Sequence, residues 1–258
     1  MPVASAVPAA TVVIARILPD DAFEVFVVKR HGKAGFMAGA HVFPGGRVDD
    51  DDASFDKDRF AVCAIRETYE ETGILLARPE SGLALTTTDP IVALSARLAG
   101  GMDFVEAMSA VGLVPDTEAL ISIGWWITPE AEPRRYDTRF FFAVVPPLQR
   151  HSAAPDGNEV VQGDWFTPSA ALAAYAAGSI SLSPPTLVTL EELAGLKLSQ
   201  VRGHAWPRRA VRPTVNEIDG RIVLALPGDA LHEVKDAVWP HRTRMVIDAQ
   251  QRFRSSLA

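Results

Sequence analysis

The sequence predicts an α+β fold built on a mixed β-sheet, and three observations lead to this prediction. Apolar, β-branched runs of strand length recur at 11–16, 24–29, 120–128, 139–145 and 160–166. Helical patterns are interspersed among them without the regular strand–helix–strand alternation of parallel α/β folds. No internal repeat with a period of about 20 to 50 residues occurs, which excludes a solenoid or a propeller.

The predicted elements of the N-terminal half follow in chain order. The runs 11–16 and 24–29 are joined through Pro19-Asp20-Asp21 and are predicted to form a hairpin. The segment Gly32–Gly46 is rich in glycine and is predicted to be a loop. A helix is predicted over 57–72, with Gly73 as its stop signal, and two short helices over 91–111 are separated at Gly100-Gly101.

In the C-terminal half, three more strands precede two helices. The strands are expected at 120–128, 139–145 and 160–166, and the helices at 168–177 and 187–196. The tail after Ser199 contains several prolines and one clear strand at 221–226. In Trp125-Trp126, neighbouring strand residues point to opposite faces, so one ring is predicted to be in the core.

Composition limits the class of protein. The chain has 258 residues, 48% of them hydrophobic and 22% charged, which is ordinary for a globular protein. Its net charge of −7 argues against non-specific nucleic-acid binding. The single cysteine, Cys63, cannot form an intramolecular disulfide, and no apolar stretch is long enough for a transmembrane helix. We therefore expect a cytoplasmic protein without a nucleic-acid or membrane partner, with a homodimeric state left open.

The most informative segment is Arg66-Glu67-Thr68-Tyr69-Glu70-Glu71-Thr72-Gly73-Ile74. On a helix, Glu67 lies beside Glu70 and Glu71, and Arg66 lies beside Glu70. Three carboxylates within about one turn repel one another, and the dipole near a helix C-terminus increases the repulsion. This pattern suggests a hard divalent cation, which prefers oxygen ligands, while an ordinary solvated helix surface stays open as the alternative for this segment taken alone.

Together with Gly45-Gly46 upstream, this segment resembles the signature of the Nudix hydrolases, G-x5-E-x7-R-E-U-x-E-E-x-G-U. Residues 66–74 match its second half, with Thr68 in place of the usual aliphatic residue. The stretch from Gly46 to Ile74 is six residues longer than the standard signature. Counting back from Arg66, Asp58 occupies the place of the upstream glutamate.

The sequence around the signature is similar to one branch of this family. This branch comprises the nucleoside-diphosphate-linked moiety X hydrolases, which include the peroxisomal coenzyme A diphosphatase of mammals and its bacterial relatives. The resemblance is carried by 35–46, Trp126-Ile127-Thr128-Pro129, 134–141 and Ser183-Pro184-Pro185-Thr186. It implies a Nudix fold, an α/β/α sandwich, over about residues 8–200, with a helical insert at about 90–112. Residues 201–258 are expected to be a C-terminal extension packed on the same domain.

The resemblance also implies roles for individual residues. Glu67, Glu70 and Glu71, with the carbonyl of Gly46, would hold Mg²⁺ or Mn²⁺. Glu67 would be either a metal ligand or the catalytic base, Glu70 would share in catalysis, and Arg66 would orient the carboxylates. Glu159 is a candidate for an additional carboxylate from a loop outside the signature.

Arginines are the candidates for binding the phosphates of a substrate, because their planar fork suits phosphate oxygens. Arg30, Arg135 and Arg139 are the candidates beside the predicted strands, and Arg202, Arg208, Arg209 and Arg212 form a second group in the tail. The expected substrate is a small diphosphate compound. Coenzyme A, acyl-coenzyme A, ADP-ribose, dinucleotides and nucleotide sugars all remain open.

Two other functional classes were weighed. A Nudix-fold isomerase of the isopentenyl diphosphate type needs a catalytic cysteine, and Cys63 is in the wrong place for that role. A binding or regulatory module without turnover typically loses carboxylates of the signature, whereas all three are present here. A hydrolase is therefore the favoured prediction.

Overall fold

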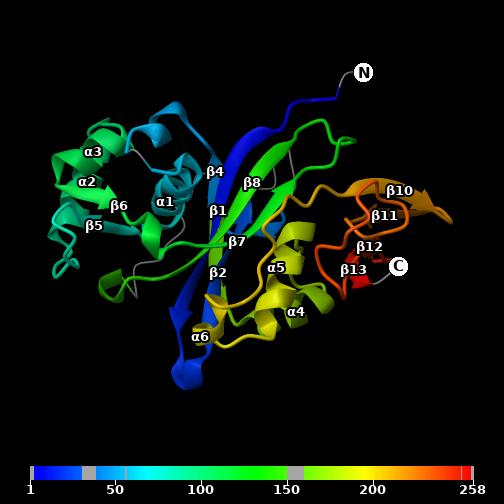
Figure 1. Cartoon of the computed structure of the whole chain (residues 1–258). Coiled ribbons are helices and arrows are strands. Elements are labelled where there is room, and N and C mark those ends of the chain that lie inside the picture. Colours follow the sequence, from blue (N-terminus) through cyan, green and yellow to red (C-terminus); the bar gives the residue numbers. More distant parts are fainter. Residues whose placement is uncertain (1–2, 31–38, 56, 150–159, 251, 257–258) are drawn as a thin grey trace.

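The computed structural model describes residues 3–30, 39–55, 57–149, 160–250 and 252–256, without the side chains of residues 30 and 160–162. At its centre lies a seven-stranded mixed sheet with the order β3-β2-β1-β8-β7, in which β4 also pairs with β1 and β9 with β2 (Figure 1). Only β1 and β8 run parallel among these pairs. The strands are β1 (Val7–Ile17), β2 (Phe23–Arg30), β3 (His41–Val42), β4 (Gly45–Arg47), β7 (Ile121–Ile127), β8 (Tyr136–Val144) and β9 (Val160–Phe166).

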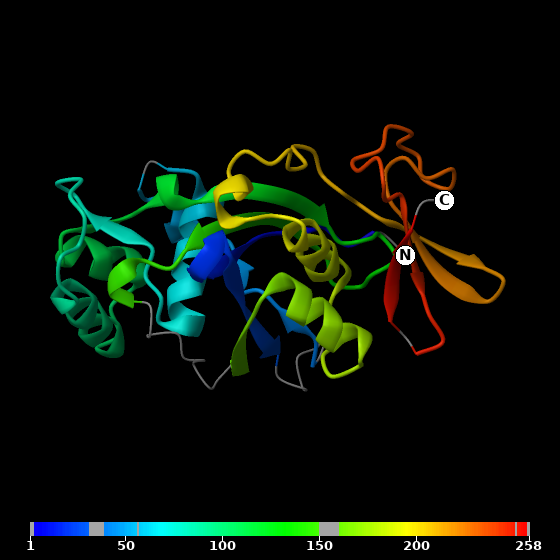
Figure 2. The same ribbon diagram turned by 90° about the horizontal axis from the view of Figure 1, so that it is seen from below.

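Helices cover both faces of this sheet, which gives the predicted sandwich (Figures 1 and 2). On one side α1 (Arg59–Thr72) lies against the sheet, with α2 (Asp89–Ala99) and α3 (Phe104–Ala110) beyond it, and on the other side lie α4 (Pro168–Ala176), α5 (Pro184–Ala194) and α6 (Leu198–Val201). Both parts of the predicted helical insert, α2 and α3, are present, with the break at Gly100-Gly101 as expected. The α+β prediction is thus confirmed.

The central strand β1 explains why the molecule has two hydrophobic clusters. Its middle residues are buried on both sides of the sheet. Val12 and Ile14 point into the cluster beneath α1, whereas Val13 and Ala15 point into the cluster beneath α5. A strand that is apolar at consecutive positions, not at alternate ones, is what a sheet covered on both faces requires.

Helix α1 forms because its apolar positions recur at helical spacing and both of its ends are capped. The side chain of Asp58 accepts a hydrogen bond from the backbone N–H of Phe60 at 3.0 Å. At the other end Gly73 adopts a left-handed conformation with φ of 72°. Ala61, Ala64 and Ile65 face the sheet, and the acidic residues point away from this cluster.

Several strands were not expected from the sequence. The predicted loop Gly32–Gly46 lies partly outside the described residues, and its described part contains β3 and β4, each too short to show an alternating pattern. The strands β5 (Ala77–Pro79) and β6 (Leu113–Pro115), which flank the insert and pair with each other, are similarly short. No helix in the described ranges is long and apolar enough to cross a membrane.

The tail forms a second, antiparallel sheet with the order β10-β11-β12-β13. Its strands are β10 (Thr214–Ile218), β11 (Arg221–Ala225), β12 (Arg244–Ile247) and β13 (Phe253–Ser256). Only β11 was predicted. Val211 lies beside the edge of β7, exchanging backbone hydrogen bonds with Trp125 and Ile127 at 2.8 and 2.9 Å. Leu224, Trp239 and Met245 of the tail join the cluster beneath α5.

Candidate active site

The acidic turn of α1 is organised by Arg66, whose side chain is only 9% exposed. Its Nε and Nη2 each donate a hydrogen bond of 3.0 Å to a different oxygen of the Asp52 carboxylate. Asp52 is completely buried and lies in η2 (Asp50–Ala53), a short 3₁₀ helix that precedes α1. A bidentate pair of this kind fixes the plane of the guanidinium group.

With its plane fixed in this way, Arg66 presents its remaining nitrogen to the other acidic residues. Nη1 donates to Glu67 at 2.9 Å and to Glu70 at 3.1 Å. One nitrogen therefore holds two carboxylates close together, while Nη2 also donates to the carbonyl of Arg47 at 2.9 Å. The arrangement offsets part of the repulsion that the sequence predicts for this turn.

Strand β4 brings Gly45 and Gly46 against the same turn. The backbone N–H of Gly45 donates to the Glu71 carboxylate at 3.1 Å. A Cβ atom at Gly46 would lie 2.4 Å from the carboxylate carbon of Glu67, so only glycine lets Glu67 pack there. The pairing of β4 with β1 holds Gly46 at this position, because Gly46 lies opposite Ala10 on the central strand β1.

Burial and charge shift the ionisation of this group of residues. Burial alone would lower the pKa of Arg66, but its hydrogen bond to Asp52 and the nearby Glu67 raise it above the ordinary value. Partial burial raises the pKa of Glu70, against the opposing effect of Arg66. Burial also raises the pKa of the Cys63 thiol, so this cysteine stays protonated and is no candidate for a nucleophile.

The donor set of the turn fits a hard cation, although the side chains are not positioned as a finished metal site. Within the described residues, no group of three or more His, Cys, Asp or Glu side chains is placed to hold a metal ion. The geometry explains this, since Glu70 points to Arg66 and Glu71 accepts from Gly45. The carboxylates of the turn and the nearby Gly46 carbonyl offer oxygen atoms, the ligands that Mg²⁺ prefers.

The structure identifies a partner of Arg66 that the sequence argument placed elsewhere. Counting back from Arg66 indicated Asp58, but Asp58 is exposed and caps α1. Asp52 takes the expected place when the count runs forward from Gly46, so the six additional residues lie between Asp52 and Arg66. That forward count was the signal in the sequence that could have found it.

Of the candidate phosphate-binding arginines, Arg139 lies on the same face of the sheet as α1. Its guanidinium carbon is 3.4 Å from the centre of the Trp125 ring and 5.1 Å from that of Phe60 in the first turn of α1. Arg139 pairs with Ala10, the residue that also pairs with Gly46. The neighbouring Trp126 is 5% exposed in the opposite cluster, which confirms that one ring of the pair is in the core.

The other candidates have different positions. Arg135 donates to the backbone carbonyls of Thr128 and Ala4 at 3.1 and 2.6 Å and lines a cavity against the tail, not the acidic turn. Arg30 ends β2, but its side chain is not described, and Glu159 lies outside the described residues.

Comparisons with known proteins agree with this geometry. A family model described as the NUDT19 Nudix domain matches residues 56–193, and one described as the NUDIX domain matches residues 7–90. Relatives named acyl-coenzyme A diphosphatase NUDT19 from Gallus gallus and Homo sapiens are each 28% identical, over 81% and 83% of this chain and 73% of theirs. The crystal structure of a NUDIX hydrolase from Alicyclobacillus acidocaldarius matches with a TM-score of 0.65 and 30% identity, over 76% of this chain and 95% of that one.

Proposed function

Because the chain belongs to the Nudix family and is a Nudix hydrolase, we propose that it cleaves the diphosphate linkage of a nucleoside diphosphate joined to another moiety. The reaction would depend on Mg²⁺ or Mn²⁺. Coenzyme A and its acyl thioesters are the proposed substrates, because the relatives from Gallus gallus and Homo sapiens are named acyl-coenzyme A diphosphatases. ADP-ribose, dinucleotides and nucleotide sugars are the alternatives.

One observation carries the proposal: of the three carboxylates of one helical turn, Glu71 and Glu67 lie against the backbone of Gly45 and Gly46, and Arg66 holds the third beside them. The turn lies at the C-terminal end of α1, where the helix dipole adds negative charge. A site with this much negative charge would repel a diphosphate unless a cation lies between them. Electrostatics therefore supports a cation as part of the substrate-binding site.

In this proposal each residue has a distinct task. Glu67, Glu70 and Glu71, with the carbonyl of Gly46, would hold the cation, which supplies charge neutralisation and a bound water of lowered pKa. Arg66 keeps Glu67 and Glu70 in place through its contacts of 2.9 and 3.1 Å. Glu67 is the candidate for taking a proton from the attacking water, and Glu159 is the candidate for an additional carboxylate.

Arg139 is the proposed contact for a phosphate or for the base of the substrate. Its Nε has no hydrogen-bond partner in the described part of the chain, although it is buried. A buried donor without a partner is unfavourable, and an oxygen of the substrate would satisfy it. Because Ala10 pairs with both residues, Arg139 lies two strands from Gly46, or roughly 10 Å at the usual strand spacing, and Gly46 lies against the acidic turn.

The metal requirement is tested by measuring hydrolysis of coenzyme A with Mg²⁺, with Mn²⁺ and with excess chelator. We expect turnover only when a divalent cation is present. A second readout does not depend on activity: a cation that binds only the folded state raises the melting temperature by mass action. Unchanged turnover in chelator, or no change in melting temperature at saturating metal, would contradict the metal site.

The substrate is tested with a panel of coenzyme A, acyl-coenzyme A, ADP-ribose, a dinucleotide and a nucleotide sugar at fixed Mg²⁺, with products identified by mass. Cleavage within the diphosphate of coenzyme A should give adenosine 3′,5′-bisphosphate and a phosphopantetheine product. Much faster hydrolysis of ADP-ribose or the dinucleotide would replace the proposed substrate while leaving the chemistry of the site intact.

A further inference from the structure

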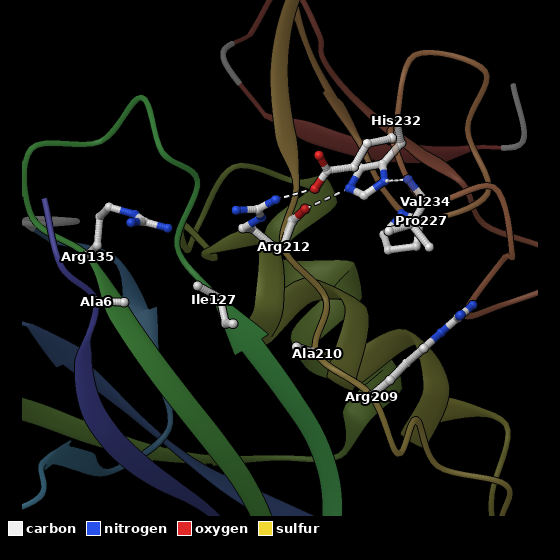
Figure 3. Close-up of a pocket in the computed structure, with 10 residues that line it drawn as sticks. Ala6, Ile127, Arg135, Arg209, Ala210, Arg212, Pro227, His232 and Val234 are labelled. Carbon is white, nitrogen blue, oxygen red and sulfur yellow. Dashed lines mark hydrogen bonds and ion pairs between the residues drawn. The ribbon is translucent and has the colours of Figure 1, made fainter. Parts of the chain in front are cut away.

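A cavity lies between the main sheet and the tail, apart from the acidic turn. It has a volume of about 420 Å³ and is walled by the end of β7, the residues before β8 and two segments of the tail. Its apolar lining includes Ile127, Ala210 and Pro227, and its charged lining consists of three arginines and one carboxylate, Arg135, Arg209, Arg212 and Glu233. Figure 3 shows the side chains of Arg135 and Arg212 extending toward each other, whereas Arg209 points away.

Arg135 is the unusual residue of this cavity. It is 8% exposed, yet its side chain donates to two uncharged backbone carbonyls, those of Thr128 and Ala4. No carboxylate in the described part of the chain forms an ion pair with it. Burying a charge without a counter-ion is strongly unfavourable, so buried charges in proteins are normally paired.

Arg212 faces Arg135 and could share an anion with it. Its guanidinium group forms ion pairs with Glu130 and Glu233, whose side chains are 51% and 60% exposed. Ion pairs between such exposed groups contribute little, about 0 to 1 kcal/mol, so an incoming anion can replace them at small cost. The two arginines then supply a double positive charge directed into one cavity.

His232 holds the part of the wall beside Arg212 in place. The ring of His232 is 2% exposed, and its Nδ1 accepts a hydrogen bond of 2.9 Å from the Val234 N–H. Nε2 therefore carries the proton and donates to the Arg212 carbonyl at 2.8 Å. This hydrogen bond holds the backbone of Arg212 in place, so its side chain starts from a defined position beside the cavity.

We propose that this cavity binds a phosphomonoester group of a small organic molecule between Arg135 and Arg212, with the apolar part of that molecule against Ile127, Ala210 and Pro227. A phosphomonoester carries close to two negative charges at neutral pH, which matches the two guanidinium groups. The site is separate from the acidic turn and does not rest on the function proposed for that turn.

The test is isothermal titration calorimetry in chelator with phenyl phosphate, which joins a phosphomonoester to an apolar body. Both the wild-type protein and Glu71→Gln should bind it, because neither a metal nor the acidic turn is needed. Arg212→Ala should weaken binding at least about 10-fold, as expected for the loss of a charge-assisted contact. Ala210→Leu, which fills the cavity without changing its charge, should also weaken binding.

Arg221→Ala is the matched control, because Arg221 is an exposed arginine of the same tail and lies outside the cavity lining. Equal affinity of the wild type and Arg212→Ala, or no measurable binding to the wild type at millimolar phenyl phosphate, would overturn the proposal. A further titration with coenzyme A and its 3′-dephospho form identifies the source of the phosphate. If Arg212→Ala weakens the binding of coenzyme A but not of its 3′-dephospho form, the site binds the 3′-phosphate of coenzyme A. If it weakens the binding of neither, while still weakening that of phenyl phosphate, the site binds the phosphate of a separate phosphomonoester.

Discussion

The contact between Arg66 and Asp52 shows how one residue outside helix α1 helps to determine the geometry of the acidic turn. The pattern of 66–74 in the sequence predicted which carboxylates come together, because helical spacing alone places them on one turn. It could not predict that Asp52 would be the buried partner, because that contact spans 14 positions and depends on how the acidic loop folds back. Local spacing is readable from sequence, whereas the path of an irregular loop is set by tertiary packing.

The first prediction compares the two aspartates that could have filled this role. Asp52→Asn removes the charge that neutralises the buried Arg66, and breaking a buried ion pair on one side costs about 3 to 5 kcal/mol. Asp58→Asn should leave stability nearly unchanged, since asparagine caps a helix as well as aspartate does. Urea unfolding of both variants measures the difference. Equal loss of stability in the two variants would contradict a special role for Asp52 in supporting Arg66.

The second prediction concerns the proposed catalytic function of Glu71. Glu71→Gln keeps an oxygen that can accept from the Gly45 N–H, so the fold should survive, but it removes the charge that would hold a cation. We expect turnover to fall at least about 100-fold, the usual scale for losing a catalytic charge or proton-transfer group. The exposed Glu80 provides the control, and Glu80→Gln should have wild-type activity. Full activity of Glu71→Gln with an unchanged circular dichroism spectrum would contradict the proposed role.

At the scale of secondary-structure elements, the sequence was most informative where an element is long and carries its own pattern. Helix α1, the hairpin of β1 and β2 and the two insert helices were all predicted from period and capping signals. The strands β3, β4, β5 and β6 have two or three residues each and exist because a neighbouring strand pairs with them. So short an element carries no periodic signal, and β4, which brings Gly46 to the acidic turn, is one of them.

The third prediction concerns the departure from the family pattern inside α1. The Thr68 hydroxyl is buried and donates only to the Ala64 carbonyl at 2.6 Å, which helical geometry already pairs with a backbone N–H. Thr68→Val should therefore stabilise the protein by roughly 0.5 to 1 kcal/mol, because it removes a polar group from the core. Thermal or urea unfolding measures this.

Thr72 is the matched comparison on the same helix. Its hydroxyl donates to the Thr68 carbonyl and also accepts from the backbone N–H of Ile74 at 3.2 Å. Thr72→Val leaves that buried N–H without its partner and should destabilise the protein by about 1 to 3 kcal/mol. If both variants change the free energy of unfolding in the same direction, the difference between the hydrogen bonds of the two hydroxyls does not determine the effect.

At the scale of the whole molecule, the tail completes one of the two hydrophobic clusters. Trp239 of the tail packs against Trp126 of β7 with ring centres 5.8 Å apart, and Leu224 and Met245 lie in the same cluster. The contact between the two tryptophans joins residues more than 100 positions apart, and no local sequence pattern predicts such a contact. This is why the sequence showed one strand of the tail and not the sheet to which it belongs.

Charged contacts also join the tail to α5, through a buried arginine. Arg242 is 4% exposed and donates to Glu192 at 2.8 Å and to Glu191 at 2.9 Å. Burial by itself raises the pKa of Glu192, but Arg242 and the neighbouring His241 together hold it below its ordinary value. The folded protein therefore binds the proton of this carboxyl less readily than the unfolded chain does.

The fourth prediction follows from the sign of this shift. A carboxyl whose pKa is depressed by folding stabilises the protein above its unfolded value of about 4.3, and this stabilisation is lost as the pH falls through the depressed value. The free energy of unfolding should thus decline more steeply below about pH 5 in the wild type than in Glu192→Gln, as measured by urea unfolding at a series of pH values. At neutral pH the variant should be less stable by up to about 3 kcal/mol, because Arg242 keeps only Glu191 as a partner. The acidic residues of the rest of the molecule are common to both proteins and cancel in the difference between their curves. Parallel curves would therefore mean that the attachment of the tail does not depend on the charge of Glu192.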